Sequence, residues 1–179
     1  MNASTASMYG FNNLILIGMP GAGKSTIGVI LAKALGLQFV DTDLEIQRRE
    51  GRLLQTIVDA QGHLHLREVE SQVCQELDCD NSVVATGGSV VYSPAAMDAL
   101  SQMGRIIWLS VPLEEIQRRV DNVSSRGLAR SPGQSLEDLF REREPLYRQY
   151  AQITVHCDRL RPDEVVTEIL TRVAGNLAL

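Results

Sequence analysis

The sequence predicts an α/β domain with one mainly parallel, five-stranded sheet and helices on both of its faces. Short apolar segments read as strands at 14–17, 38–41, 83–86, 105–110 and 153–156. Longer amphipathic segments with helical periodicity separate these strands. Continuous apolar strands that alternate with helices are typical of a parallel sheet that is buried on both faces.

The intervening segments predict the helices and loops of a single domain over residues 13–175. Helices are expected at 26–35, 44–50, 54–61, 64–77, 94–103, 136–150 and 162–173, and another begins at Pro112. The stretch at about 122–135 is rich in Ser, Gly and Arg, which predicts a mobile lid. Residues 1–12 are expected to form a flexible tail.

The composition excludes several classes of partner. The 179 residues are 44% hydrophobic, and 17 basic against 22 acidic residues give a formal net charge of −5. An acidic chain argues against nucleic acid or an anionic membrane as the main partner. No apolar run approaches the ~20 residues that span a bilayer, and no signal-peptide pattern opens the chain. We expect a monomer in the cytoplasm that acts on a small molecule.

Residues 18–25, Gly-Met-Pro-Gly-Ala-Gly-Lys-Ser, match the phosphate-binding pattern G-x-x-x-x-G-K-[ST] between a strand and a helix. The glycines permit a tight turn whose N–H groups face phosphate oxygens, and the helix dipole adds to this attraction. Lys24 would contact the β- and γ-phosphates, and Ser25 would offer its hydroxyl to Mg²⁺. The residues expected to bind MgATP are Gly21, Ala22, Gly23, Lys24, Ser25 and Thr26.

Two carboxylates follow the second expected strand, in Asp41-Thr42-Asp43. Residues two apart on a strand share a face, so both can point into the crevice at the carboxyl edge of the sheet. One could hold Mg²⁺ through water, and the other could bind or deprotonate a substrate hydroxyl. Thr42 and Glu45 also fit a capping box, so helix capping stays open as an alternative, and the two roles can coexist.

Further motifs occur in a fixed order along the chain. They are Phe39-Val-Asp-Thr-Asp43, Leu66-Arg67-Glu-Val-Glu70, Thr86-Gly87-Gly88, Arg119, Arg126 and Arg143-Glu-Pro-Leu-Tyr147. With them the chain resembles the shikimate kinase family from about Asn12 to Val173. The resemblance implies a P-loop kinase fold and an ATP-dependent transferase that makes shikimate 3-phosphate for aromatic amino acid biosynthesis. A kinase for gluconate or a hydroxy amino acid, and a nucleotide-binding paralogue with weak catalysis, remain alternatives.

The resemblance also implies roles for individual residues. Arg67 and Arg143 would bind the substrate carboxylate, because a guanidinium fork suits a planar acid. Glu70, three residues after Arg67 on the same helix face, would orient it. Asp43 would bind the substrate hydroxyls and act as the base. Backbone N–H groups of Gly87, Gly88 and Ser89 would contact the substrate.

The remaining roles concern the nucleotide and the metal. Asp41 would lie in the water shell of Mg²⁺, and Arg119 would stack on the adenine. Arg126 would close with the lid and neutralise charge on the transferring phosphoryl group, so the expected catalytic residues are Lys24, Asp43 and Arg126. An ordinary solvated surface position is the alternative for the arginines.

The chain departs from the family pattern at three places. Ser89 stands where the family has the third glycine of a triplet, and Gly127 follows Arg126 where proline is usual. His63 and His65 precede Arg67 where the family carries glutamate and phenylalanine. If position 89 needs a positive φ, serine is strained there by ~1 kcal/mol or more. Otherwise its hydroxyl can add a contact.

Overall fold

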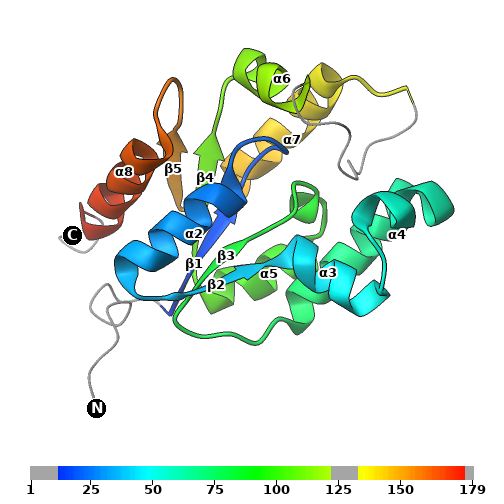
Figure 1. Ribbon diagram of the computed structural model, residues 1–179, viewed down its shortest axis with the longest axis horizontal. Coiled ribbons are helices and arrows are strands. Elements are labelled where there is room, and N and C mark those ends of the chain that lie inside the picture. The colour runs from blue at the N-terminus through cyan, green and yellow to red at the C-terminus, as the bar shows by residue number, and fades with distance from the viewer. Residues whose placement is uncertain (1–11, 122–132, 176–179) are drawn as a thin grey trace.

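The computed structural model describes residues 12–121 and 133–175, which include one five-stranded sheet (Figure 1). The expected tail and lid, at 1–12 and 122–135, lie mostly outside these residues. The strands are β1 (Asn13–Ile17), β2 (Gln38–Asp41), β3 (Ser82–Ala85), β4 (Arg105–Ser110) and β5 (Ile153–His156). Their order is β2-β3-β1-β4-β5, and every neighbouring pair is parallel, which confirms the predicted sheet.

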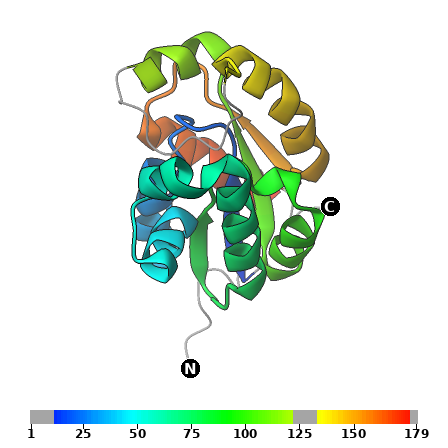
Figure 2. The ribbon, with the colours of Figure 1, turned by 90° about the vertical axis from the view of Figure 1, so that its right-hand side faces the viewer.

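Helices cover both faces of this sheet. α2 (Lys24–Leu35) and α8 (Pro162–Gly175) contact each other on one face. α5 (Pro94–Met103) and α7 (Leu136–Tyr150) lie on the opposite face, as Figure 2 shows. β1 lies between β3 and β4, and its residues Leu14–Ile17 are fully buried. The phosphate-binding loop therefore starts from the most buried strand of the domain.

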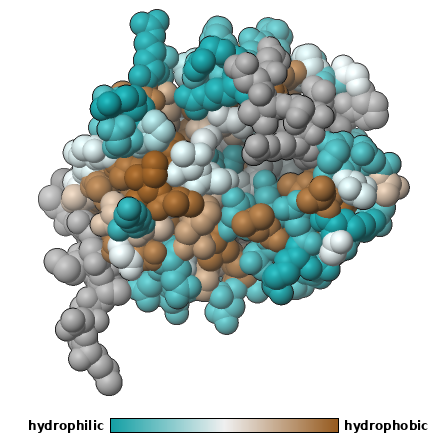
Figure 3. Space-filling model, in the orientation of Figure 1, coloured by the Kyte–Doolittle hydropathy of each residue, from teal (hydrophilic) through white to brown (hydrophobic). Residues whose placement is uncertain are grey.

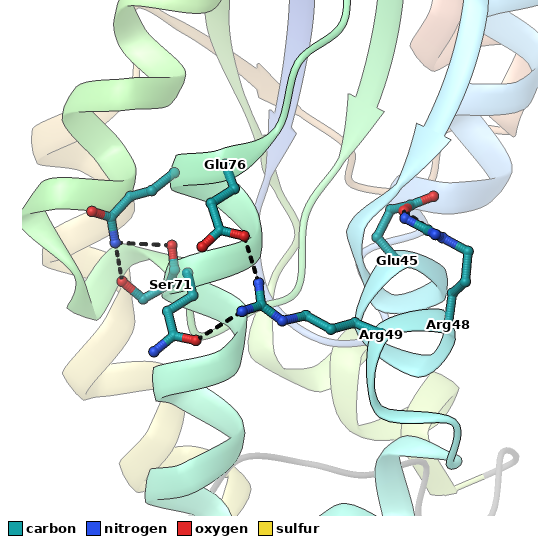
Figure 4. Close-up of polar contacts among 7 residues, drawn as sticks. Glu45, Arg48, Arg49, Ser71 and Glu76 are labelled. Carbon is teal, nitrogen blue, oxygen red and sulfur yellow. Dashed lines mark hydrogen bonds and ion pairs between the residues drawn. The ribbon is translucent and has the colours of Figure 1, made fainter.

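A smaller unit, formed by α3 (Thr42–Glu50) and α4 (Leu54–Glu76), packs beside the sheet. The two helices expected at 54–61 and 64–77 form the single element α4, which Gly62 interrupts with φ 84° and ψ 169°. The unit has its own apolar cluster, made of Ile46, Ile57, Leu66, Val69 and Val73. Outside this cluster, Arg49 on α3 reaches Glu76 on α4 at 2.7 Å (Figure 4). That pair is exposed, so the apolar cluster supplies most of the stabilisation.

The remaining helices are α6 (Leu113–Asp121), which follows β4, and the short 3₁₀ helix η1 (Val90–Tyr92), which follows β3. On the face seen in Figure 3, hydrophobic residues gather in separate areas among polar ones. The large exposed hydrophobic residues of the described ranges are Val29, Leu44, Leu53 and Leu64. Within the same ranges no helix has the length and apolar character needed to cross a membrane.

Asn13 joins three elements at the amino end of the sheet. Its Nδ2 donates to the carbonyls of Cys79 at 2.8 Å and Met103 at 3.0 Å, and its Oδ1 accepts from the N–H of Ser82 at 2.9 Å. Asn13 is fully buried, so water cannot replace these bonds. Its side chain thus ties β1 to the start of β3 and to the end of α5.

We predict that Asn13→Ala lowers the free energy of unfolding by about 2–4 kcal/mol, because it leaves buried polar groups without partners. Urea unfolding followed by circular dichroism measures this change. The neighbouring Asn12 is exposed, so Asn12→Ala should stay within about 0.5 kcal/mol of the unsubstituted protein. Equal effects of the two substitutions would contradict the role assigned to the Asn13 side chain.

Candidate active site

A cavity of about 880 Å³ opens beyond the carboxyl ends of the strands. This is the edge at which open parallel sheets bind ligands. The cavity is lined by residues of the phosphate-binding loop, of α3 and α4, of the turn after β3, and of α6 and α7. The polar and glycine residues among them include Gly21, Gly23, Lys24, Ser25, Asp41, Asp43, Glu70, Gly87, Gly88, Ser89, Arg119 and Arg143.

The loop between β1 and α2 has the backbone of an anion-binding turn. Gly21 and Gly23 adopt positive φ angles of 81° and 92°, which side-chain-bearing residues rarely adopt. Gly23 is also the N-cap of α2, where no side chain caps the helix and no acidic residue occurs in the first turn. The first N–H groups of α2 can therefore bind an anion. Ser25 and Thr26 are exposed in the same turn.

Lys24 is buried and lies across this loop. Its Nζ donates to the carbonyls of Gly18 at 2.8 Å and Met19 at 3.0 Å. Burial lowers the pKa of Lys24 to about 8, while the negative charges of Asp43 and Glu70 act in the opposite direction. Since an ammonium group has three N–H donors, one remains for a bound anion.

Asp41 and Asp43 both line the cavity, but not as two residues of one strand. β2 ends at Asp41, and Asp43 already lies in the first turn of α3, so the prediction of a shared strand face is wrong. The residue that caps α3 also differs from the one expected. Asp41, not Thr42, caps α3, since its Oδ1 accepts from the N–H of Asp43 at 3.0 Å. The buried hydroxyl of Thr42 accepts from the N–H of Gly87 at 3.1 Å.

Asp43 and Glu70 face each other around Gly87. A Cβ atom on Gly87 would overlap Oε1 of Glu70 and lie 2.9 Å from Oδ1 of Asp43, so a larger residue would displace the two carboxylates from their positions. Burial raises the pKa of Asp43 to about 6, and the charge of Asp41 adds to this effect. Burial likewise raises the pKa of Glu70 to about 7. Within the described part of the chain, Oε1 of the buried Glu70 has no hydrogen-bond partner.

The backbone of Ser89 is unstrained. The expectation of strain at this departure from the family is therefore wrong. Its φ is −98°, so the position does not require glycine. The other expectation, an added contact, is what the structure shows: the buried Ser89 hydroxyl donates to Oε2 of Glu70. Sequence reasoning assigned Glu70 only to the orientation of Arg67 and missed that it faces the cavity. That assignment used the three-residue spacing between Arg67 and Glu70, which gives no indication that Glu70 contacts Ser89.

The two predicted carboxylate-binding arginines meet at Tyr92. Arg143 is 1% exposed, lines the cavity, and donates from Nε to the hydroxyl of Tyr92 at 3.2 Å. The Arg67 guanidinium lies over the Tyr92 ring, 3.9 Å from its centroid, and Arg67 is not one of the residues that line the cavity. Sequence reasoning missed Tyr92. Its only indication in the sequence is that an aromatic residue follows shortly after the pair Gly87-Gly88.

Arg119 and Arg126 were both predicted to serve the nucleotide. Arg119 lines the cavity next to the phosphate-binding loop, where its Nη1 donates to the carbonyls of Gly21 at 3.3 Å and Ala22 at 3.4 Å. Its Nε donates to Glu115 at 2.7 Å, which fixes the guanidinium on α6. Arg126 lies outside the described residues, and its role stays a prediction.

Comparison with known proteins decides the family. The model of a family described as shikimate kinase matches residues 20–174. The chain belongs to this family. The shikimate kinase of Pseudomonas aeruginosa (strain LESB58) is 42% identical over 164 residues, which cover 90% of this chain and 95% of the relative. That of Chromohalobacter salexigens is 40% identical over 168 residues, with 92% and 93% covered.

Solved structures agree with this assignment. The shikimate kinase of Acinetobacter baumannii, in complex with shikimate, has a TM-score of 0.84 and 31% identity, and covers 96% of this chain and 98% of its own. The shikimate kinase of Aquifex aeolicus has a TM-score of 0.78 and 32% identity, with 92% and 98% covered. A gluconokinase from Sinorhizobium meliloti, 18% identical with a TM-score of 0.51, shares the fold alone. The family and fold class expected from the sequence are confirmed, and the chain is a phosphotransferase.

The raised pKa of Glu70 predicts a pH-dependent stability. Folded Glu70 keeps its proton up to about pH 7, whereas in the unfolded chain it loses the proton near its ordinary pKa of 4.5. The folded state binds more protons in this range, so the free energy of unfolding should fall as pH rises from 5 to 8. Glu70→Gln should reduce this fall by about 2–3 kcal/mol, as measured by urea unfolding.

Glu68→Gln is the matched control, because Glu68 is exposed on the same helix. We expect it to retain the pH dependence of the unsubstituted protein. Parallel pH profiles for the Glu70→Gln variant and the unsubstituted protein would show that Glu70 is not held in its protonated form.

Proposed function

We propose that this member of the shikimate kinase family transfers the γ-phosphoryl group of ATP to a hydroxyl of shikimate. The observation that carries the proposal is the position of Arg143. Its buried guanidinium faces the same cavity as Asp43 and Lys24, so groups suited to an acid, a hydroxyl and a phosphate border one space. The shikimate-bound relative from Acinetobacter supports this choice of acceptor.

ATP and Mg²⁺ are part of the proposal, and the loop geometry fits them. The uncapped start of α2 and the positive φ angles of Gly21 and Gly23 form a turn that can hold phosphate oxygens. The Ser25 hydroxyl and, through water, the Asp41 carboxylate supply the oxygen ligands that Mg²⁺ prefers. When bound, Mg²⁺ would neutralise charge on the β- and γ-phosphates.

Asp43 is the proposed base. With a pKa of about 6 it is ionised at neutral pH and basic enough to accept a proton. The attacking hydroxyl gives its proton to Asp43 while its oxygen forms a bond to the γ-phosphorus, and the bond from that phosphorus to the leaving oxygen of ADP breaks. Polyphosphate beside Lys24 would raise the pKa of this lysine again and keep it charged as negative charge moves to ADP.

The arginines divide between the two ends of the cavity. Arg143, together with Arg67 on the ring of Tyr92, would bind the carboxylate of the acceptor. Arg119 would contact the nucleotide, and Arg126 is proposed to neutralise the transferring group. Gly87, Gly88 and Ser89 would border the acceptor ring. A monomeric state and a cytoplasmic location complete the proposal.

An assay of ADP release tests the acceptor directly. The purified protein with MgATP should be offered shikimate, gluconate and homoserine in separate reactions. We expect turnover with shikimate alone. Turnover with gluconate or homoserine instead would identify another small-molecule kinase. ATP binding without turnover of any acceptor would favour a nucleotide-binding paralogue.

Lys24→Ala should lower kcat by about 10²–10³-fold, because it removes a preorganised positive charge from the phosphate-binding loop. Steady-state kinetics with saturating MgATP and shikimate measure this loss. Lys33 is exposed in the last turn of the same helix, so Lys33→Ala should leave kcat unchanged. A Lys24→Ala variant with full kcat would refute the role of this lysine.

Asp43→Asn should lower kcat by about 10²–10⁴-fold, since the amide cannot accept the proton. In the unsubstituted enzyme kcat/KM should rise with pH through about 6, the pKa of Asp43, and the residual activity of the variant should lack this rise. Asp98→Asn, at an exposed site on α5, is the control. An unchanged pH profile in Asp43→Asn would assign the base to another group.

A further inference from the structure

Tyr92 is the last residue of η1, directly beyond the turn that borders the cavity, and it contacts both carboxylate-binding arginines. The Cζ atom of Arg67 lies 3.9 Å from the ring centroid, and the Cζ atom of Arg143 lies 5.2 Å from it. α4 supplies the first arginine and α7 the second. One aromatic ring therefore contacts two cations that belong to different elements.

The ring also reduces the cost of keeping these cations together. Two guanidinium groups this close repel each other, and Arg143 is almost fully buried, where water cannot screen its charge. The negative face of an aromatic ring attracts a guanidinium, and 3.9 Å is a stacking distance. A branched aliphatic side chain at position 92 would fill part of the same space without this attraction.

The hydroxyl of Tyr92 fixes the rotation of the Arg143 guanidinium. Nε of Arg143 donates to the hydroxyl oxygen at 3.2 Å. The same hydroxyl lowers the pKa of the Glu142 carboxyl, the residue before Arg143. A phenol oxygen can accept such a bond and keep its own O–H as a donor. The guanidinium is planar, so a fixed Nε orients its outer nitrogens. Nη1 lies 3.0 Å from where a Cβ on Gly88 would be, at the cavity wall.

The backbone that carries Tyr92 is firmly held. Val90 and Val91, which precede it, are buried, and the N–H of Tyr92 donates to the carbonyl of Ser89 at 3.0 Å. On the other side of the turn, the hydroxyl of Tyr147 donates to the carbonyl of Gly88 at 2.5 Å. These contacts hold the turn that borders the cavity and the backbone that carries the Tyr92 ring in one arrangement.

We propose that Tyr92 is a positioning residue that sets the relative orientation of Arg67 and Arg143 for a planar carboxylate. Its face holds Arg67, and its hydroxyl holds Arg143. The contacts of Tyr92 on which the inference depends are with the two guanidinium groups, so it acts through the arginines. The inference rests on the proposed function, in which these arginines bind the carboxylate of shikimate.

Two substitutions separate the contributions of ring and hydroxyl. Tyr92→Phe keeps the face for Arg67 and removes the hydroxyl from Arg143, while Tyr92→Leu removes both. We expect KM for shikimate to rise about 3–10-fold in Tyr92→Phe and about 10–100-fold in Tyr92→Leu. kcat and KM for ATP should stay within about threefold, because the phosphate-binding loop is untouched. Tyr150→Phe, on α7 outside the cavity lining, should change none of these values.

A second acceptor distinguishes positioning from a general structural effect. An analogue of shikimate with the carboxylate reduced to a hydroxymethyl group cannot use the arginine pair. The Tyr92 variants should therefore raise KM for shikimate and leave KM for the analogue unchanged. Equal increases in KM for both acceptors, or an unchanged KM for shikimate in Tyr92→Leu, would overturn the inference.

A measurement without turnover separates this inference from the proposed function. Hydrogen exchange of the Arg143 Nε–H, followed by ¹⁵N NMR, should be slow in the unsubstituted protein and faster in Tyr92→Phe. If the unsubstituted protein phosphorylates neither acceptor, the proposed function fails. The exchange rates would still show whether Tyr92 holds Arg143, and equal rates in the two proteins would refute that.

Discussion

Four ionisable side chains around one cavity, the buried Lys24, Glu70 and Arg143 and the partly buried Asp43, constrain everything else at the site. Each would be costly to bury alone, and their opposite charges compensate one another. The raised pKa values of Asp43 and Glu70 place both acids close to protonation near neutral pH. Small changes in local charge therefore move protons here. Binding of an anionic nucleotide and an anionic acceptor is consequently coupled to the protonation of these groups.

The turn after β3 shows how this charge cluster determines which residue types are accepted at positions 87 and 89. Gly87 leaves room for the carboxylates of Asp43 and Glu70, which a side chain at this position would displace. Two residues later the backbone has an ordinary negative φ, so serine is accepted. The hydroxyl of Ser89 then satisfies one oxygen of Glu70. The departure from the family's glycine triplet is thus compatible with the site.

Some features could be predicted because they depend on local pattern. The phosphate-binding loop follows from glycine spacing, and the strands follow from apolar runs. The prediction placed Asp41 and Asp43 in the correct cavity but gave a wrong structural reason. It treated both as strand residues, whereas the chain turns into α3 immediately after Asp41. The φ angle of Ser89 and the partner of Glu70 could not be predicted, since both depend on packing between elements.

The sequence by itself determined the secondary-structure segments, the phosphate-binding loop and the identity of the charged side chains, because periodicity and glycine content act over a few neighbouring residues. Only the tertiary structure decided the strand order β2-β3-β1-β4-β5 and the contact of Tyr92 with two arginines. Tyr92 and Arg143 are 51 residues apart in the chain. Their contact exists because η1 and α7 are packed together on the same sheet, a relation that no local pattern encodes.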